Sequence, residues 1–139
     1  MRHLTTTTLA LLLLASAGEV SAQAQPAADK SAQERAALQA ARDKALQEVA
    51  KDPKNLPQWK RLANLQRQLG DEKGTEDALA GALALDPKDA GVHFMLGLLY
   101  EKREEWARAS AAFRACLENA GKDPIKDICA KHLRRTEKP

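Results

Sequence analysis

An internal period of 34 residues constrains the fold of this chain more than any other feature of its sequence. The tripeptide Asp-Pro-Lys at 52–54 recurs at 86–88. The same offset links other pairs of identical or similar residues, namely Leu62 with Leu96, Leu65 with Leu99, Leu79 with Phe113, and Leu83 with Leu117, while Ala41, Thr75 and Ala109 extend it to three registers. So many matches at one offset indicate a repeat architecture, in which each copy is a small unit that stacks on the next.

Each copy has the pattern of two amphipathic helices. Apolar residues recur at spacings of three and four, which places them on one helical face. The first helix of a pair is expected to end near Gly70 in one copy and near the charged turn at 103–105 in the other. Hydrophobic residues make up 44% of the chain but aromatic residues only 4%, and alanine and leucine supply most of the apolar content. Such a composition favours closely packed helices over sheets.

Helices are also predicted on both sides of the copies. The sequence from Ser31 to Glu34 fits a capping box, so a helix is expected to begin at Ser31 and to end before Pro53. A last helix is expected from Pro124, with Asp123 as its N-cap. The sequence therefore predicts an all-α fold of about six helices over residues 31–138.

The N-terminal residues 1–22 have the organisation of an export signal. A short basic start is followed by a leucine-rich apolar run at 9–17 and by the small residues Val20-Ser21-Ala22. This run is shorter than the roughly 20 apolar residues that cross a bilayer. We expect cleavage after Ala22, or else after Ala24, and the alternative is an uncleaved anchor. Residues 23–30 have linker composition.

The period and the residues that recur in it resemble the tetratricopeptide repeat, whose pattern is W-x2-L-G-x2-Y, then A-x3-F, then P. The first copy, 55–88, supplies Trp59, Leu62, Ala63, Gln66, Thr75, Leu79 and Pro87 at these positions, and Ala82 fits a small position of the family. The second, 89–122, supplies His93, Leu96, Gly97, Tyr100, Ala109, Phe113 and Gly121. The clearest departures are Gln66, His93 and Gly121. Residues 123–136 would form a C-terminal capping helix.

The resemblance implies an α-solenoid of antiparallel helix hairpins whose inner surface is lined by the first helix of each repeat. A peptide or helix of another protein would bind in this groove. The resemblance places six residues there: Lys60, Asn64, Arg67, Phe94, Leu98 and Glu101. Lys60 and Asn64 match two residues of the clamp with which chaperone-binding members hold a C-terminal carboxylate. Met95, Ile125 and Cys129 depart from that clamp, so a chaperone tail is not expected. The alternative is that these side chains are solvated or pack on a cap.

Cys116 and Cys129 leave three interpretations open. The helices that carry them would be neighbours in a stacked array, so a disulfide could join them in an oxidising compartment. The thiols could instead be free and inert. A redox or metal-handling role would also use His132, which lies three residues after Cys129 on the same helical face. No cofactor is predicted.

The remaining patterns argue against catalysis and against nucleic-acid binding. The sequence contains no glycine-rich phosphate loop, no GxSxG and no HExxH. Lys and Arg number 22 against 19 acids, and the charges are interleaved, whereas a nucleic-acid site needs a clustered basic face. We therefore expect not an enzyme but an interaction scaffold or adaptor in the bacterial periplasm, without stable membrane insertion after cleavage. The alternatives are a redox or metal-handling accessory and a self-assembling oligomer such as a homodimer.

Overall fold

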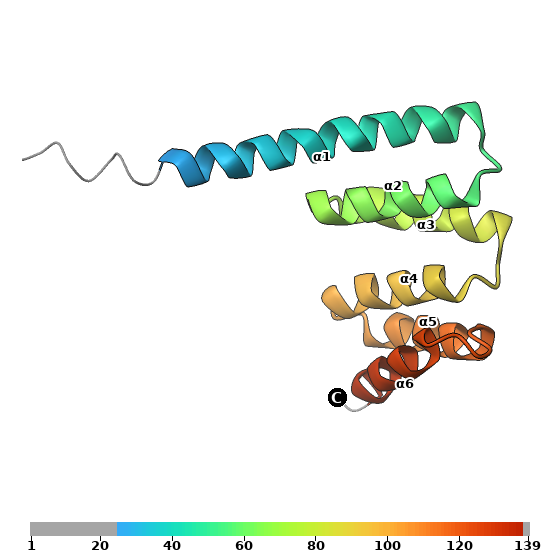
Figure 1. Cartoon of the computed structure of the whole chain (residues 1–139). Coiled ribbons are helices and arrows are strands. Elements are labelled where there is room, and N and C mark those ends of the chain that lie inside the picture. Colours follow the sequence, from blue (N-terminus) through green and yellow to red (C-terminus); the bar gives the residue numbers. More distant parts are fainter. Residues whose placement is uncertain (1–24, 138–139) are drawn as a thin grey trace, which may run out of the picture. The chain divides into compact units, whose positions relative to one another are not determined.

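The structure is a computed structural model that describes residues 25–137, and within this range all secondary-structure elements are helices, joined by short turns (Figure 1). The six helices are α1 (Gln25–Lys51), α2 (Leu56–Leu69), α3 (Glu72–Leu85), α4 (Ala90–Lys102), α5 (Trp106–Asn119) and α6 (Ile125–Thr136). The predictions of an all-α fold and of six helices are thereby confirmed. None of these helices has the length and apolar content needed to cross a membrane.

The chain divides into two compact units, Met1–Gln33 and Glu34–Pro139. In the first unit the described residues are helical and form the beginning of α1. The second unit contains the rest of α1 and the five helices that follow. The predicted export signal, residues 1–22, lies outside the described residues.

Helix α1 begins earlier than its sequence predicts. It starts at Gln25, so residues 25–30, which have linker composition, are helical, and Ser31 lies inside the helix and not at its N-cap. The prediction of a capping box was therefore wrong. Alanine has the highest helix propensity of all residues, and the alanines around Ser31 favour continuing the helix through it. The other end agrees with expectation, because α1 stops at Lys51, just before Asp52 and Pro53.

The hydrogen bonds that begin the first helix of each repeat recur with the 34-residue period. Asn55 accepts a hydrogen bond from the backbone N–H of Gln58 (3.3 Å), and Asp89 accepts one from that of Val92 (2.8 Å). Each of these side chains satisfies an otherwise unpaired donor in the first turn of its helix. The two copies are therefore capped in the same way at the start of α2 and of α4.

The turns that end these two helices also match. Gly70 has a φ of 78°, and Glu104, which lies 34 residues later, has a φ of 58°. In the first turn the N–H of Asp71 bonds to the carbonyl of Gln66 (2.9 Å), and in the second the N–H of Glu105 bonds to that of Tyr100 (2.9 Å). The left-handed residue that lets the chain reverse is thus a glycine in one copy and a glutamate in the other.

The core of the second unit lies between helix faces that approach closely. Leu79 and Val92 are completely buried, as are the small residues Ala63 and Ala82. Ala45 and Val49 bring α1 into the same cluster. Small side chains allow neighbouring backbones to come near each other, while the larger ones fill the space between them.

Helix α6 closes the C-terminal end of the unit and packs against α5 and α4 (Figure 1). Asp123 accepts a hydrogen bond from the N–H of Ile125 (2.9 Å), and Pro124 already has helical backbone angles, with φ −54°. Pro124 stands at the N-cap and the helix begins at Ile125, so it starts one residue later than predicted, although Asp123 still bonds to its first N–H. This arrangement fixes where the last helix starts.

Candidate functional site

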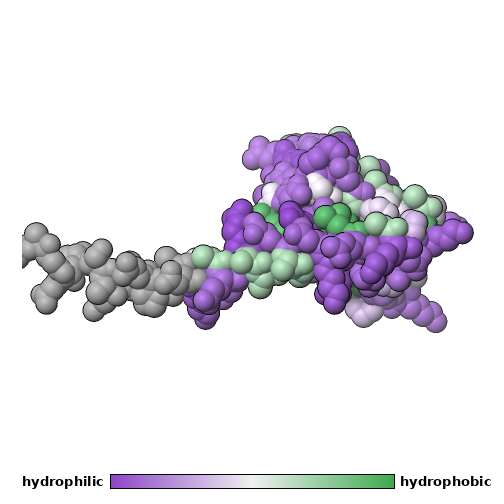
Figure 2. Space-filling model, turned by 90° about the horizontal axis from the view of Figure 1, so that it is seen from above, coloured by the Kyte–Doolittle hydropathy of each residue, from purple (hydrophilic) through white to green (hydrophobic). Residues whose placement is uncertain are grey.

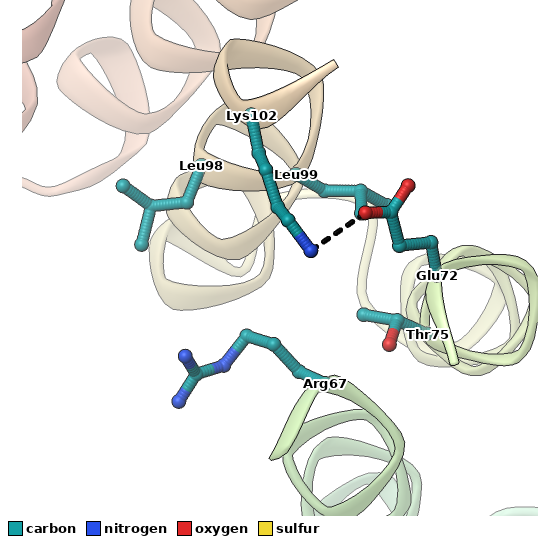
Figure 3. A pocket seen from close by; sticks show the side chains of 6 residues that line it. All are labelled: Arg67, Glu72, Thr75, Leu98, Leu99 and Lys102. Atoms are coloured by element: carbon teal, nitrogen blue, oxygen red, sulfur yellow. Dashed lines mark ion pairs between the residues drawn. The ribbon is translucent and has the colours of Figure 1, made fainter. Parts of the chain in front are cut away.

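A pocket of about 280 Å³ opens between α2, α3 and α4 (Figure 3). It is lined by Arg67 from α2, Glu72 and Thr75 from α3, and Leu98, Leu99 and Lys102 from α4. Leu98 and Leu99 form the apolar part of the wall, and charged groups from each of the three helices stand around it. Of the six residues that the resemblance placed in a groove, the pocket brings together two, Arg67 and Leu98.

The charges at the pocket do not cancel locally. Lys102 Nζ lies 2.7 Å from a carboxylate oxygen of Glu72, and this ion pair forms one edge of the pocket (Figure 3). The Arg67 guanidinium donates a hydrogen bond to the side-chain oxygen of Asn64 (2.9 Å). Within residues 25–137 Arg67 makes no ion pair with a carboxylate, although its side chain is exposed. Arg67 is therefore a cation whose charge the surrounding chain leaves uncompensated.

A network of ion pairs supports the α3 and α4 sides of this pocket. Glu72 also contacts Arg103 (3.0 Å), and its pKa is lowered by hydrogen bonds from Lys102 and Arg103. Arg103 and Arg108 both bond to Glu76 at 2.7 Å. These bonds, together with one from the Tyr100 hydroxyl, lower the pKa of Glu76 from 4.5 to about 2. Because a network of charges holds side chains more firmly than an isolated exposed pair, it orders this wall.

Lys60 has a partner inside the unit. Its ammonium lies 2.8 Å from Asp89, the residue that caps α4. Burial opposes ionisation of Asp89, but the bonds from Lys60 and from the N–H of Val92 outweigh it, so the pKa of Asp89 lies below its usual range. This pair links α2 to the start of α4, and Lys60 is not available as a free cation.

Phe94 and Glu101 face the last helix and not the pocket. The ring of Phe94 contacts those of Phe113 and His132, with centroids 6.1 Å and 5.7 Å away. Glu101 accepts a hydrogen bond from His132 Nδ1 (2.9 Å) and forms an ion pair with Arg135 (3.0 Å). Both residues therefore belong to the contact of α4 with α6. For Phe94 and Glu101 the alternative prediction therefore holds, namely that the side chain packs on the C-terminal capping helix.

The sulfurs of Cys116 and Cys129 are joined in a disulfide between α5 and α6, with the Cα atoms 6.2 Å apart. Both residues are completely buried. The described residues contain no group of three or more His, Cys, Asp or Glu side chains placed to hold a metal ion. His132 stacks on Phe113, with ring centroids 5.0 Å apart, and is engaged by Glu101. The three residues of the redox or metal alternative are thus all used in attaching α6.

Sequence reasoning missed four residues of the pocket, namely Glu72, Thr75, Leu99 and Lys102. Thr75 stands at a repeat position that is alanine in the second copy, and Glu72 and Lys102 are the first residue of α3 and the last residue of α4, beside charge-rich turns. The signal that could have found them is the contact between the second helix of one repeat and the first helix of the next. Here α3 contacts α4, so residues from both helices line the same opening.

Large apolar side chains at the surface do not gather beside the pocket. Hydrophilic residues cover most of the face shown in Figure 2, and hydrophobic residues come to the surface between them. Among the described residues the exposed large hydrophobic side chains are Leu46, Leu85, Trp106 and Ile128, on α1, α3, α5 and α6 respectively. None of them lines the pocket.

No protein-family model matches this chain, and no curated protein matches it significantly.

Proposed function

We propose that this chain is a protein-binding adaptor that holds a short segment of another protein in the pocket between α2, α3 and α4. The observation that carries the proposal is the combination of an uncompensated cation, Arg67, and a half-buried leucine, Leu98, in one opening. Binding sites commonly combine an apolar wall with a few polar groups that set the orientation of the ligand. The ion-pair network of α3, α4 and α5 supplies a preorganised frame for such a site.

The proposed architecture behind this function is a tetratricopeptide-like solenoid. It is supported by the 34-residue recurrence of helix caps and turn hydrogen bonds. The proposed place of action is the bacterial periplasm, which rests on the sequence of residues 1–22. Repeat arrays bind many unrelated partners, so the fold alone does not select the ligand. The pocket residues must do so.

Site-specific photocrosslinking tests the proposal. A photoreactive amino acid is introduced at position 98 in the full-length chain, and in a control chain at position 111, an exposed alanine of α5 outside the pocket. Both chains are expressed in a bacterial host and irradiated. A discrete adduct through position 98, absent through position 111 and reduced when Arg67→Gln is added, is the expected result. Adducts of equal yield at both positions, or none at position 98, would refute the proposal.

A further inference from the structure

The further inference concerns the chemistry of the ligand at this pocket, and it rests on the proposed function. We infer that the bound segment is acidic and aliphatic, with a carboxylate that pairs with Arg67 next to an aliphatic side chain that packs on Leu98. The partner is thus a protein segment in which an Asp or Glu is adjacent to an aliphatic residue such as leucine. Charge complementarity at the pocket is the basis of the inference.

Arg67 is the group that selects the charge. Lys102, the other cation of the pocket, already contacts Glu72, and Lys60 contacts Asp89. The only partner that the described residues give Arg67 is the neutral amide of Asn64. A guanidinium presents a planar set of donors that fits both oxygens of a carboxylate. A carboxylate of a ligand can therefore pair with the Arg67 guanidinium without displacing another acid.

The ion pairs of Glu72 reduce its repulsion of an acidic ligand. The carboxylate of Glu72 is held by Lys102 (2.7 Å) and Arg103 (3.0 Å), so two cations neutralise it. It therefore repels an incoming acid less than an unpaired carboxylate would. A basic ligand, in contrast, would meet Arg67 and Lys102 with no free acid among the pocket residues. The sign of the charge at the opening thus favours an anion.

Leu98 and Leu99 select the second feature of the ligand. Leu98 is half-buried and lines the pocket, so covering it removes apolar surface from water. In Figure 3 its side chain lies across the opening from Arg67. A carboxylate alone cannot cover the leucine. A peptide that places an aliphatic side chain beside an acidic one can satisfy both groups together.

The test uses two blocked pentapeptides that differ only in charge. One carries a leucine between two glutamates, flanked by alanines, and the other has glutamine in place of both glutamates. Binding to the full chain is followed by NMR through the methyl groups of Leu98 and Leu99 and the side-chain N–H of Arg67. We expect the glutamate peptide to shift these signals with at least about threefold higher affinity than the glutamine peptide, as a single exposed ion pair allows.

Arg67→Gln is expected to remove this preference. The matched control is Arg61→Gln, which removes the same charge from an exposed arginine on the same helix but outside the pocket. The control should retain the preference. Raising the salt from about 0.1 M to about 1 M shortens the Debye length from about 10 Å to about 3 Å, so it should weaken binding of the glutamate peptide most.

The outcomes separate this inference from the function on which it rests. Equal shifts with both peptides would overturn the acidic ligand and leave a protein-binding pocket in place, which the adduct at position 98 reports independently. No shift with either peptide would also overturn the inference. Free glutarate offers carboxylates without an aliphatic side chain. If it shifted the Leu98 methyl groups as strongly as the peptide does, a small acid would replace the protein segment as the ligand.

Discussion

His93 takes the place of Trp59 one period later and makes the corresponding hydrogen bond. The indole Nε1 of Trp59 donates to the carbonyl of Pro53 (2.9 Å), and Nε2 of His93 lies 2.8 Å from the carbonyl of Pro87. A carbonyl oxygen only accepts, so Nε2 of His93 carries the proton. Two different rings thus tie the start of a helix to the proline before it.

A glycine faces the ring of Trp59. A Cβ atom added to Gly81 would lie 2.6 Å from ring carbons of Trp59. The residue 34 positions after Gly81 is Ala115. The larger ring therefore faces a glycine, and the smaller ring belongs to the copy with an alanine.

The first prediction follows from the close contact of Gly81 with the Trp59 ring. Gly81→Ala should lower the free energy of unfolding by about 1–2 kcal/mol, because overpacking outweighs the gain in helix propensity. Combining it with Trp59→His should recover part of that loss beyond what the two single changes predict. Urea unfolding of the two single variants and the double variant measures the coupling. Strictly additive effects would contradict the close packing.

The second prediction concerns the left-handed turn at Glu104. A non-glycine residue pays about 1–2 kcal/mol there, while glycine loses about 0.5–1 kcal/mol of chain entropy on folding. Glu104→Gly should therefore raise the free energy of unfolding by about 0.5–1 kcal/mol. The reciprocal change Gly70→Ala should lower it. Both are read from urea unfolding, and a loss of stability in Glu104→Gly would mean that the side chain has a stabilising role.

The third prediction is a pH dependence that comes from Glu76. Arg103 and Arg108 lower its pKa from 4.5 to about 2 in the folded chain. Its ionised form is thus favoured by folding, so its contribution is fully present above a pH of about 4.5 and is lost as the pH falls toward about 2. Glu76→Gln should cost about 1 kcal/mol at neutral pH, near the upper value for a partly exposed pair.

The comparison of the wild type with Glu76→Gln across this pH range isolates the contribution of Glu76. The difference in unfolding free energy should shrink as the pH falls. Glu118→Gln is the control, because this exposed acid of α5 makes no ion pair within the described residues. A difference that stays constant with pH would contradict the assignment to Glu76.

The fourth prediction concerns the bond between α5 and α6. The disulfide closes a loop of 13 residues in sequence separation, for which the chain-entropy model gives a stabilisation of about 3 kcal/mol. A reducing agent should lower the unfolding free energy by about that amount. The control is the double variant Cys116→Ala, Cys129→Ala, whose unfolding should not respond to reduction. If the wild type does not respond either, the two sulfurs are not joined in solution.

The helices were predictable because their signals are local. The sequence predicted that the first helices of the two copies end near Gly70 and near residues 103–105 and that the last helix starts at Pro124, and α2, α4 and α6 have boundaries close to these positions. The start of α1 was not predictable from a capping motif alone. Alanine-rich sequence on both sides of Ser31 favours helix as strongly as the capping motif favours a start.

The pocket could be predicted only in part, since it depends on contacts between helices. The family resemblance implied that Arg67 and Leu98 lie in a groove, on the first helices of successive repeats, and both line the opening. The resemblance also implied that Phe94 and Glu101 lie in the groove. Nothing in their spacing reveals that α6 contacts this part of α4. The position of a neighbouring helix is tertiary information, which the repeat pattern alone does not contain.

Asp89 links α2 to the start of α4. One carboxylate holds both the first turn of α4 and the Lys60 ammonium of α2. A force that spreads these helices must therefore break the ion pair, release the cap, or carry the end of α4 along with α2. Since the pocket lies between the same two helices, spreading them to admit a wider ligand would strain this link. An acid that does not line the opening thus joins two of the helices that form it.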